Sequence, residues 1–100
     1  MVIVLFRSRL TDAAGEDYAT MATAMEVRAR AMPGFVGFKT FRAEDGERLS
    51  VIHWESEDTL RAWADDERHR TAQHLGREKW YSSFQIEVAQ VVRTYGFERP

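Results

Sequence analysis

The sequence has 100 residues, of which 44% are hydrophobic and 30% are charged, as expected for one ordinary globular domain. Its formal net charge of −2 argues against general nucleic-acid binding, because neutralising phosphates requires a basic surface. The chain has no cysteine, which excludes disulfide bonds, thiolate metal sites and a cysteine nucleophile.

The chain opens with a β-rich segment, Val2 to Leu10, which we predict to be a strand. Its apolar run VIVLF is too short to span a membrane or to form the core of a signal peptide, and Arg7 and Arg9 follow it directly. We therefore expect a cytoplasmic protein that has no membrane partner.

The next segment, Asp17 to Met32, repeats apolar residues at intervals of three and four, which predicts an amphipathic helix. Its apolar stripe consists of Tyr18, Met21, Ala22, Met25, Ala29 and Met32. Pro33 and Gly34 should end the helix, because proline disfavours helical backbone in the residue before it. We expect the stripe to pack mainly in the core, although flexible methionines can leave an adaptable pocket beneath the helix.

Two β-rich segments, FVGFKTFRAE and ERLSVIHWES, flank Asp45 and Gly46, a dipeptide that suits a tight hairpin turn. Ser56 is placed to cap the N-terminus of a following helix, whose first turn carries Glu57 and Asp58. The predicted buried side of that helix consists of Leu60, Trp63 and Ala64.

A polar helical segment follows, from about Glu67 to Lys79, and Phe84 to Tyr95 then reads as a β-branched strand. One face of the helical segment carries His69, Ala72, Gln73, Gly76 and Trp80. His69 and His74 lie among charged residues, so we expect exposed positions for both of them rather than metal-ligand positions.

The resulting order, β-α-β-β-α-β, predicts a single α+β domain over residues 1–100 with the ferredoxin-like arrangement, a four-stranded antiparallel sheet with helices on one face. The strands are apolar on both sides: Val2 and Val4 alternate with Ile3 and Leu5. Since the helices can cover only one face, we predict a homodimer through the other. The alternative is that long Arg and Lys side chains cover that face in a monomer.

The hairpin, followed by HWES, LRAW, HRTAQH and a closing VVRTYGF, resembles the antibiotic biosynthesis monooxygenase family of dimeric α+β barrels over nearly the whole chain. Some members of that family oxidise aromatic polyketide intermediates or quinols with O₂ and without metal or flavin, whereas others bind and degrade haem. The resemblance thus implies a cofactor-independent monooxygenase acting on a flat aromatic phenol or quinol. The alternative is a dimer, associated with stress or biosynthesis, that binds a small hydrophobic aromatic molecule without chemistry.

The haem-degrading branch of the family uses an asparagine near the end of the first strand, a tryptophan in the second main helix and a histidine ten residues later. By this resemblance the three positions correspond to Ser8, Trp63 and Gln73. His74 is adjacent, but one helical step turns a side chain by about 100°. We therefore disfavour haem binding and expect no cofactor.

The candidate catalytic residues are Trp63 and His53. Trp63 is a candidate wall for an aromatic slot, although an ordinary core tryptophan is the competing interpretation. His53 is the candidate base, because imidazole titrates near neutral pH. A hydrogen-bonded interface histidine is the alternative, and the base role fails if His53 faces the dimer partner.

The candidate substrate contacts are Phe6 and Ser8 on one face of the first strand, together with Gln73 and His74. For Phe6 ordinary core packing competes with a pocket role, and for Ser8 hydrogen bonding at the strand edge does so. No HxxxH or His-carboxylate spacing appears, so we predict no metal site.

Overall fold

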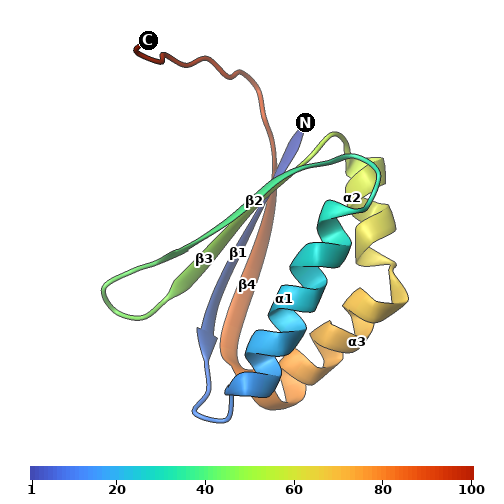
Figure 1. The fold of residues 1–100 in the computed structure, drawn as a ribbon, viewed down its shortest axis with the longest axis vertical. Coiled ribbons are helices and arrows are strands. Elements are labelled where there is room, and N and C mark those ends of the chain that lie inside the picture. Colours follow the sequence, from blue (N-terminus) through green and yellow to red (C-terminus); the bar gives the residue numbers. More distant parts are fainter.

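A computed structural model describes residues 1–100, except for the side chains of Glu67 and Arg68. The elements are β1 (Val2–Leu10), α1 (Glu16–Arg30), β2 (Phe35–Arg42), β3 (Arg48–Trp54), α2 (Glu57–Ala64), α3 (Glu67–Leu75), a π-helical turn η1 (Gly76–Trp80) and β4 (Tyr81–Gln90). The strands form one antiparallel sheet in the order β2-β3-β1-β4, and the helices pack on one face of it (Figure 1). The predicted α+β, ferredoxin-like class is confirmed.

Strand register determines which residues face the helices. Val2 of β1 pairs with Trp54 of β3, and Val4 pairs with Ile52. Val2, Val4 and Trp54 are buried in the core with Ala29 of α1, so the even-numbered positions of β1 face the helices. The odd-numbered positions of β1 and their partners in β3 therefore face the other way.

The helix ends follow local chemistry. The side chain of Ser56 accepts a hydrogen bond from the backbone N–H of Thr59 at 3.2 Å, while the Thr59 hydroxyl accepts one from the backbone N–H of Ser56. The predicted cap at Ser56 is thus confirmed as a reciprocal capping box. Helix α1 carries Glu16 and Asp17 in its first turn, where the helix dipole favours negative charge.

Gly34 joins α1 to β2 with a positive φ of 83°. A Cβ atom at this position would overlap the side chain of Thr59. We expect Gly34→Ala to lower the free energy of unfolding by at least ~1–2 kcal/mol, the usual cost of a left-handed residue with a side chain, with the overlap adding to it. Urea denaturation measures the loss. Gly96→Ala is the matched control, because Gly96 has no positive φ and no atom lies within 4 Å of the added carbon, so it should be nearly neutral.

The end of β4 differs from the sequence-based prediction of a strand from Phe84 to Tyr95. The strand is Tyr81–Gln90, and Gln90 pairs with Val2 at the start of β1. The N–H of Val91 donates to the carbonyl of Met1 at 3.0 Å, and the pairing of β4 with β1 ends there. Residues 92–100 lead away from the sheet (Figure 1), and the apolar side chains in this segment, Val92, Tyr95 and Phe97, are exposed.

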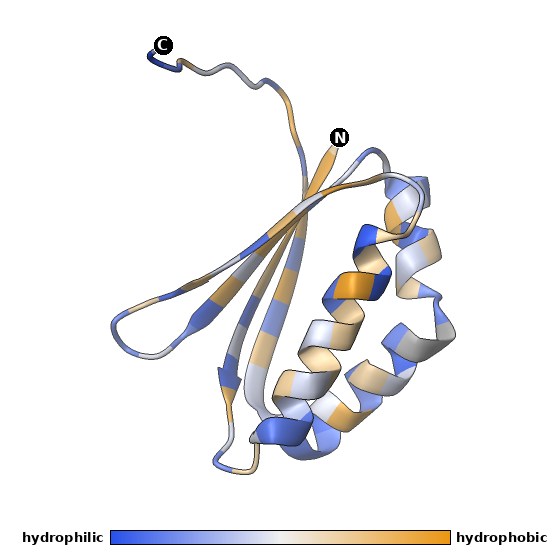
Figure 2. Ribbon diagram, in the orientation of Figure 1, coloured by the Kyte–Doolittle hydropathy of each residue, from blue (hydrophilic) through white to orange (hydrophobic). Residues whose placement is uncertain are grey.

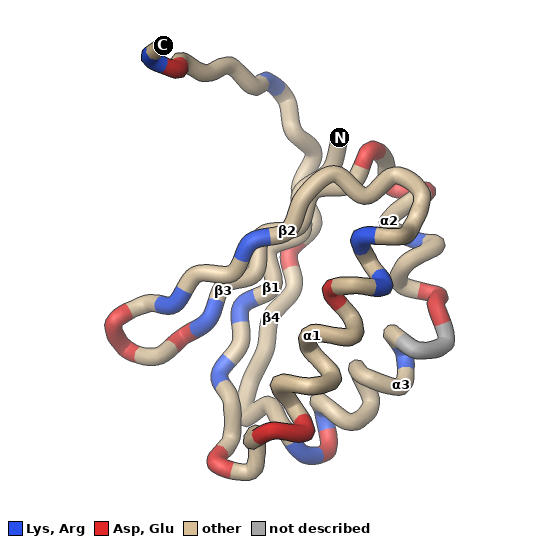
Figure 3. Tube along the Cα trace, in the orientation of Figure 1, with Lys and Arg blue, Asp and Glu red and all other residues tan. Residues whose placement is uncertain are grey.

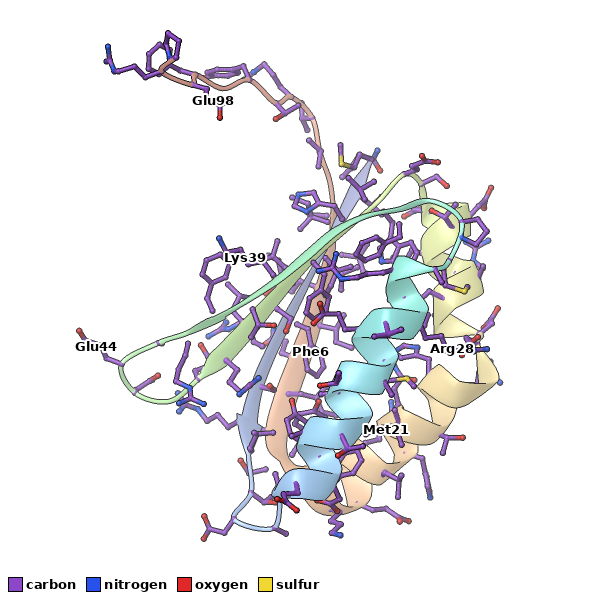
Figure 4. All side chains as sticks on the ribbon, in the orientation of Figure 1. Phe6, Met21, Arg28, Lys39, Glu44 and Glu98 are labelled. Atoms are coloured by element: carbon purple, nitrogen blue, oxygen red, sulfur yellow. The ribbon has the colours of Figure 1, made fainter. Side chains whose placement is uncertain are left out.

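The sheet face away from the helices carries a cluster of apolar side chains from β1, β2 and β3, whereas β4 contributes Gln85 and Glu87 to it. Ile3, Leu5 and Val51 are half-buried there, and Phe41 is 49% exposed. Lys39, which pairs with Val51, places its Nζ atom 5.5 Å from the Phe41 ring centroid, and Figure 4 shows it on the side of the sheet away from α1. This lysine lies over one aromatic ring. The helices pack on the opposite face of the sheet, so they do not cover this one in the single chain. Figure 2 shows the hydrophobic positions that recur along these strands.

Two ion pairs hold the β2–β3 hairpin against β1. Arg7 bonds Glu47 at 3.1 Å and Arg9 bonds Asp45 at 2.7 Å, which joins the basic end of β1 to the acidic turn (Figure 3). The hydrogen bond from Arg9 lowers the pKa of Asp45.

Across the described part of the chain, no helix is long and apolar enough to cross a membrane.

Candidate functional site

A cavity of about 350 Å³ lies between the helix-facing side of the sheet and the helices. Its lining includes Val4, Phe6 and Ile52 of the sheet and Met21 and Met25 of α1. Figure 4 shows Phe6 and Met21 between the sheet and α1. This is the adaptable space beneath the first helix that the methionine stripe suggested. Its lining is dominated by apolar side chains, which suits a hydrophobic ligand.

Three stacked rings form one wall of the cavity. The Trp54 and Trp63 rings lie 6.1 Å apart with an angle of 27° between their planes, and the Trp63 and His69 rings lie 4.3 Å apart at 22°. Trp54 has no exposed surface, whereas Trp63 and His69 are half-buried. Trp63 therefore packs against the core and also lines the cavity, so the two interpretations of this residue are compatible.

His69 occupies a position that the sequence did not predict. Its half-buried imidazole lines the cavity, and its Nδ1 lies 3.1 Å from the backbone carbonyl oxygen of Trp63. Burial lowers the pKa of this imidazole, against the opposing effects of the Trp63 carbonyl and of Asp66. The expectation of an exposed His69 was wrong. The signal that could have found it was its place on one helical face with Ala72, Gln73 and Trp80.

An ion pair between helices fixes the start of α3. Arg28 of α1 donates from Nε and Nη2 to the two carboxylate oxygens of Asp66, at 2.7 and 2.8 Å. Asp66 Oδ1 also accepts a hydrogen bond from the backbone N–H of His69 at 3.1 Å. Because such a paired geometry restrains both groups, the imidazole is held at a defined position against Trp63.

A cluster of aromatic residues lines the cavity near the start of α1. Tyr18, Trp80 and Tyr81 pack edge to face, with ring centroids 5.6 and 5.9 Å from Tyr18. Trp80 Nε1 donates to Asp17 at 3.2 Å, and Lys79 and Trp80 together lower the pKa of Asp17 to about 2. Burial raises the pKa of Tyr81, which therefore keeps its hydroxyl proton at neutral pH.

The structure brings together half of the predicted site residues. Trp63, Phe6 and Gln73 all line the cavity. His53 is separate from them: it pairs with Ile3 of β1, next to the buried Trp54, so its side chain lies on the helix-free face of the sheet. His53 is therefore not positioned as a base for a ligand in the cavity beside Trp63.

The other two predicted contacts also lie outside the cavity lining. Ser8 is buried beside a smaller cleft of about 130 Å³ that is bordered by Arg7 and Glu47. The His74 side chain is 70% exposed, and its Nε2 lies 3.2 Å from Glu78. One helical step separates it from Gln73, and this step turns it toward solvent.

Neither residue at the expected haem-ligand position suits haem. Gln73 is the cavity-lining residue where the family resemblance places the axial histidine, and the imidazole of His74 faces Glu78 instead. Among the residues that the structure describes, no three His, Asp or Glu side chains lie close enough to hold a metal ion.

The chain resembles known proteins both in sequence and in structure. A family model described as antibiotic biosynthesis monooxygenase matches residues 1–75. The uncharacterized protein YqjZ of Bacillus subtilis is 35% identical over 81 residues, which are 81% of this chain and 71% of YqjZ. The structure of Rv0793 from Mycobacterium tuberculosis superposes with a TM-score of 0.82 at 17% identity, covering 95% of this chain and 98% of Rv0793. SnoaB from Streptomyces nogalater, a cofactor-independent oxygenase, gives 0.77 at 15% identity, covering 93% and 94%.

Proposed function

Because this chain belongs to the antibiotic biosynthesis monooxygenase family, we propose that it oxidises a flat hydrophobic phenol or quinol with O₂ and without a bound cofactor. The observation that carries this proposal is the apolar cavity with the stacked wall of Trp54, Trp63 and His69. SnoaB, which shares the fold, supports it because that protein is a cofactor-independent oxygenase.

The cavity suits a ligand of two or three fused rings. Its volume of about 350 Å³ falls at the small end of ligand pockets, which span roughly 300–1,000 Å³. Because Trp54 and His69 already stack on Trp63, a ligand ring can pack against the edge of Trp63 that lines the cavity, and such an aromatic pair contributes roughly 0.5–1.5 kcal/mol beyond the burial of area. Met21 and Met25 opposite Phe6 can adjust to the outline of the ligand, because methionine side chains are flexible.

The chemistry requires the substrate to become electron-rich, because ground-state O₂ is a triplet and reacts slowly with closed-shell molecules. A deprotonated phenol gives one electron to O₂, and the resulting substrate radical and superoxide combine through a new C–O bond. The peroxide takes up a proton, and loss of water from a CH–OOH carbon then leaves a carbonyl. One oxygen atom enters the product, the other leaves as water, and no external reductant is consumed.

The protein contributes exclusion of water, orientation and a proton acceptor. Val4, Ile52 and Phe6 keep the cavity floor apolar, so a substrate anion would be held by few fixed polar groups. Gln73 and Arg77 are polar side chains on the cavity lining, and we propose that they contact the substrate oxygens. A localised charge–dipole contact of this kind stabilises a developing oxyanion.

Trp63→Phe tests the site. We expect kcat/KM for O₂ uptake with two- and three-ring hydroquinones to fall about 3- to 10-fold, because the smaller ring of phenylalanine loses part of the aromatic contact with the substrate. An oxygen electrode measures the rate. Arg61→Gln is the control, because Arg61 lies on the same helix with its side chain 70% exposed, and it should keep the wild-type rate.

Two outcomes would contradict parts of this proposal, the first the role of Trp63 and the second the oxygenase reaction. Equal rates in wild type and Trp63→Phe would remove Trp63 from the site. Tight binding of these hydroquinones to the wild type, detected by quenching of tryptophan fluorescence, with no O₂ uptake would favour a small-molecule-binding protein that does no chemistry.

We further propose that two copies of the chain pair through the helix-free face of the sheet. The half-buried Ile3, Leu5 and Val51 and the exposed Phe41 support this, because apolar patches of this kind on a sheet face commonly mark interfaces. His53 lies on the same face, so we assign it to the interface rather than to the cavity.

A further inference from the structure

His69 has the hydrogen-bonding pattern of a proton acceptor. A backbone carbonyl can only accept hydrogen bonds, so the Nδ1 atom that lies 3.1 Å from the Trp63 carbonyl oxygen must carry the ring proton. In the neutral imidazole this leaves Nε2 as a bare lone pair. Within the described part of the chain, Nε2 has no hydrogen-bond partner, although the side chain lines the cavity.

The surroundings hold this tautomer and this orientation. The ring stacks on Trp63 at 4.3 Å, and the backbone of His69 is tied to Asp66, which is itself bound by Arg28. An aromatic ligand on Trp63 would therefore lie beside a fixed imidazole.

We propose that Nε2 of His69 accepts the hydroxyl proton of an aromatic substrate bound in this cavity, an inference that rests on the proposed function. The O–H bond of the substrate breaks, an N–H bond forms at Nε2, and the electron pair remains on the substrate oxygen. The resulting phenolate is the species that passes an electron to O₂.

Few charged groups around the cavity could accept the substrate proton in place of His69. From α1, Glu26 lines the cavity but accepts a hydrogen bond from Arg30 at 3.0 Å, and Arg28 is paired with Asp66 of the α2–α3 connection. From η1, Arg77 lines the cavity and brings positive charge toward a phenolate, and from β4 the Tyr81 hydroxyl stays protonated. The sheet floor contributes apolar side chains and Ser50.

The direction of the pH dependence follows from burial. Because desolvation lowers the pKa of His69 from its ordinary value of 6.5, the imidazole is neutral and able to accept a proton at pH 7. We expect kcat/KM to be flat above pH 6.5 and to fall as the pH drops through the lowered pKa, since protonation fills the lone pair.

His69→Phe removes the acceptor and keeps a ring that can stack on Trp63. Removal of a general base should lower kcat/KM near pH 7 by about 10²- to 10⁴-fold. The remaining activity should rise only at alkaline pH, where the phenol ionises by itself, near pH ~10 for a simple phenol. His74→Phe is the matched control, because that side chain is 70% exposed on the same helix, and it should keep the wild-type profile.

A second readout requires no turnover. The anion of 4-nitro-1-naphthol, a flat two-ring phenol, absorbs visible light, so its ionised fraction can be read while it is bound. We expect the wild type and His74→Phe to hold a larger ionised fraction than His69→Phe at the same pH. Where His69→Phe does not fold, His69→Asn replaces it, because its amide can still donate to the Trp63 carbonyl.

Each outcome has a defined meaning. Equal ionised fractions and equal pH profiles in wild type and the His69 variants would overturn the assignment of the base. Ionisation that depends on His69 without O₂ uptake for any hydroquinone would keep the base and reject the oxygenase function. A wild type that fails to bind the naphthol would contradict both.

Discussion

Replacing Trp54 with alanine is expected to lower the free energy of unfolding by about 3–5 kcal/mol, the range for an aromatic residue deleted from a core. Trp54 has no exposed surface, packs edge to face on Phe35 at 5.6 Å and stacks on Trp63. It also pairs with Val2 of β1 and with Phe35 of β2, at the end of the two central strands, so its neighbours cannot close the gap without moving strands. Equilibrium urea denaturation, followed by far-ultraviolet circular dichroism, measures the loss.

Two further variants show whether the loss of stability comes from the packing of the Trp54 ring. Trp54→Phe retains a ring and should recover a substantial part of the loss, because less volume is removed. Val27→Ala is the surface control: Val27 is 65% exposed on α1, so its effect should stay within about 0.5 kcal/mol. A loss below about 1 kcal/mol in Trp54→Ala would show that the core does not depend on this ring.

The fold could be predicted because its determinants are local. The three- and four-residue spacing of Tyr18, Met21 and Met25 indicated α1, and Ser56 indicated where α2 begins. Asp45 and Gly46 indicated the hairpin, and Gly46 indeed has a positive φ of 91°. Each of these signals depends on a few neighbouring residues and survives whatever the tertiary packing.

The site could be predicted only in part, because it depends on contacts between distant segments. Both faces of β3 are apolar, so alternation alone could not show that His53 faces away from the helices. For His69 the helical periodicity was correct, but the charged neighbours in the sequence favoured an exposed position. The stacking partner of His69 is Trp63 on another helix, and a sequence pattern does not reveal that contact.

The boundary of β4 was misjudged for a related reason. Residues 91–95 have the β-branched and aromatic composition of a strand, yet the pairing of β4 with β1 ends at Gln90, opposite Val2. Composition indicates that a segment can pair, whereas pairing also requires a neighbouring backbone. The exposed Val92, Tyr95 and Phe97 thus share one property with the helix-free sheet face, which is apolar surface without cover in the single chain.

Val51→Asp should convert the proposed dimer to a monomer at micromolar concentration. Val51 lies on the helix-free face, where it pairs with Leu5 on one side and Lys39 on the other. In the proposed interface the added carboxylate would be buried beside Lys39, and removing charged groups from water costs several kcal/mol per ion, which a single ion pair does not fully return. A loss of about 3 kcal/mol weakens association roughly 10²-fold, which sedimentation velocity over a range of concentrations resolves.

Val27→Asp is the matched control, because it places the same charge on the exposed surface of α1 and should leave the dimer intact. Circular dichroism of both variants shows whether each chain remains folded. The proposal predicts a folded monomer for Val51→Asp alone, since the helices and the cavity lie on the opposite face of the sheet. A wild type that sediments as a monomer at micromolar concentration, or a Val51→Asp variant with unchanged association, would exclude this face as the interface.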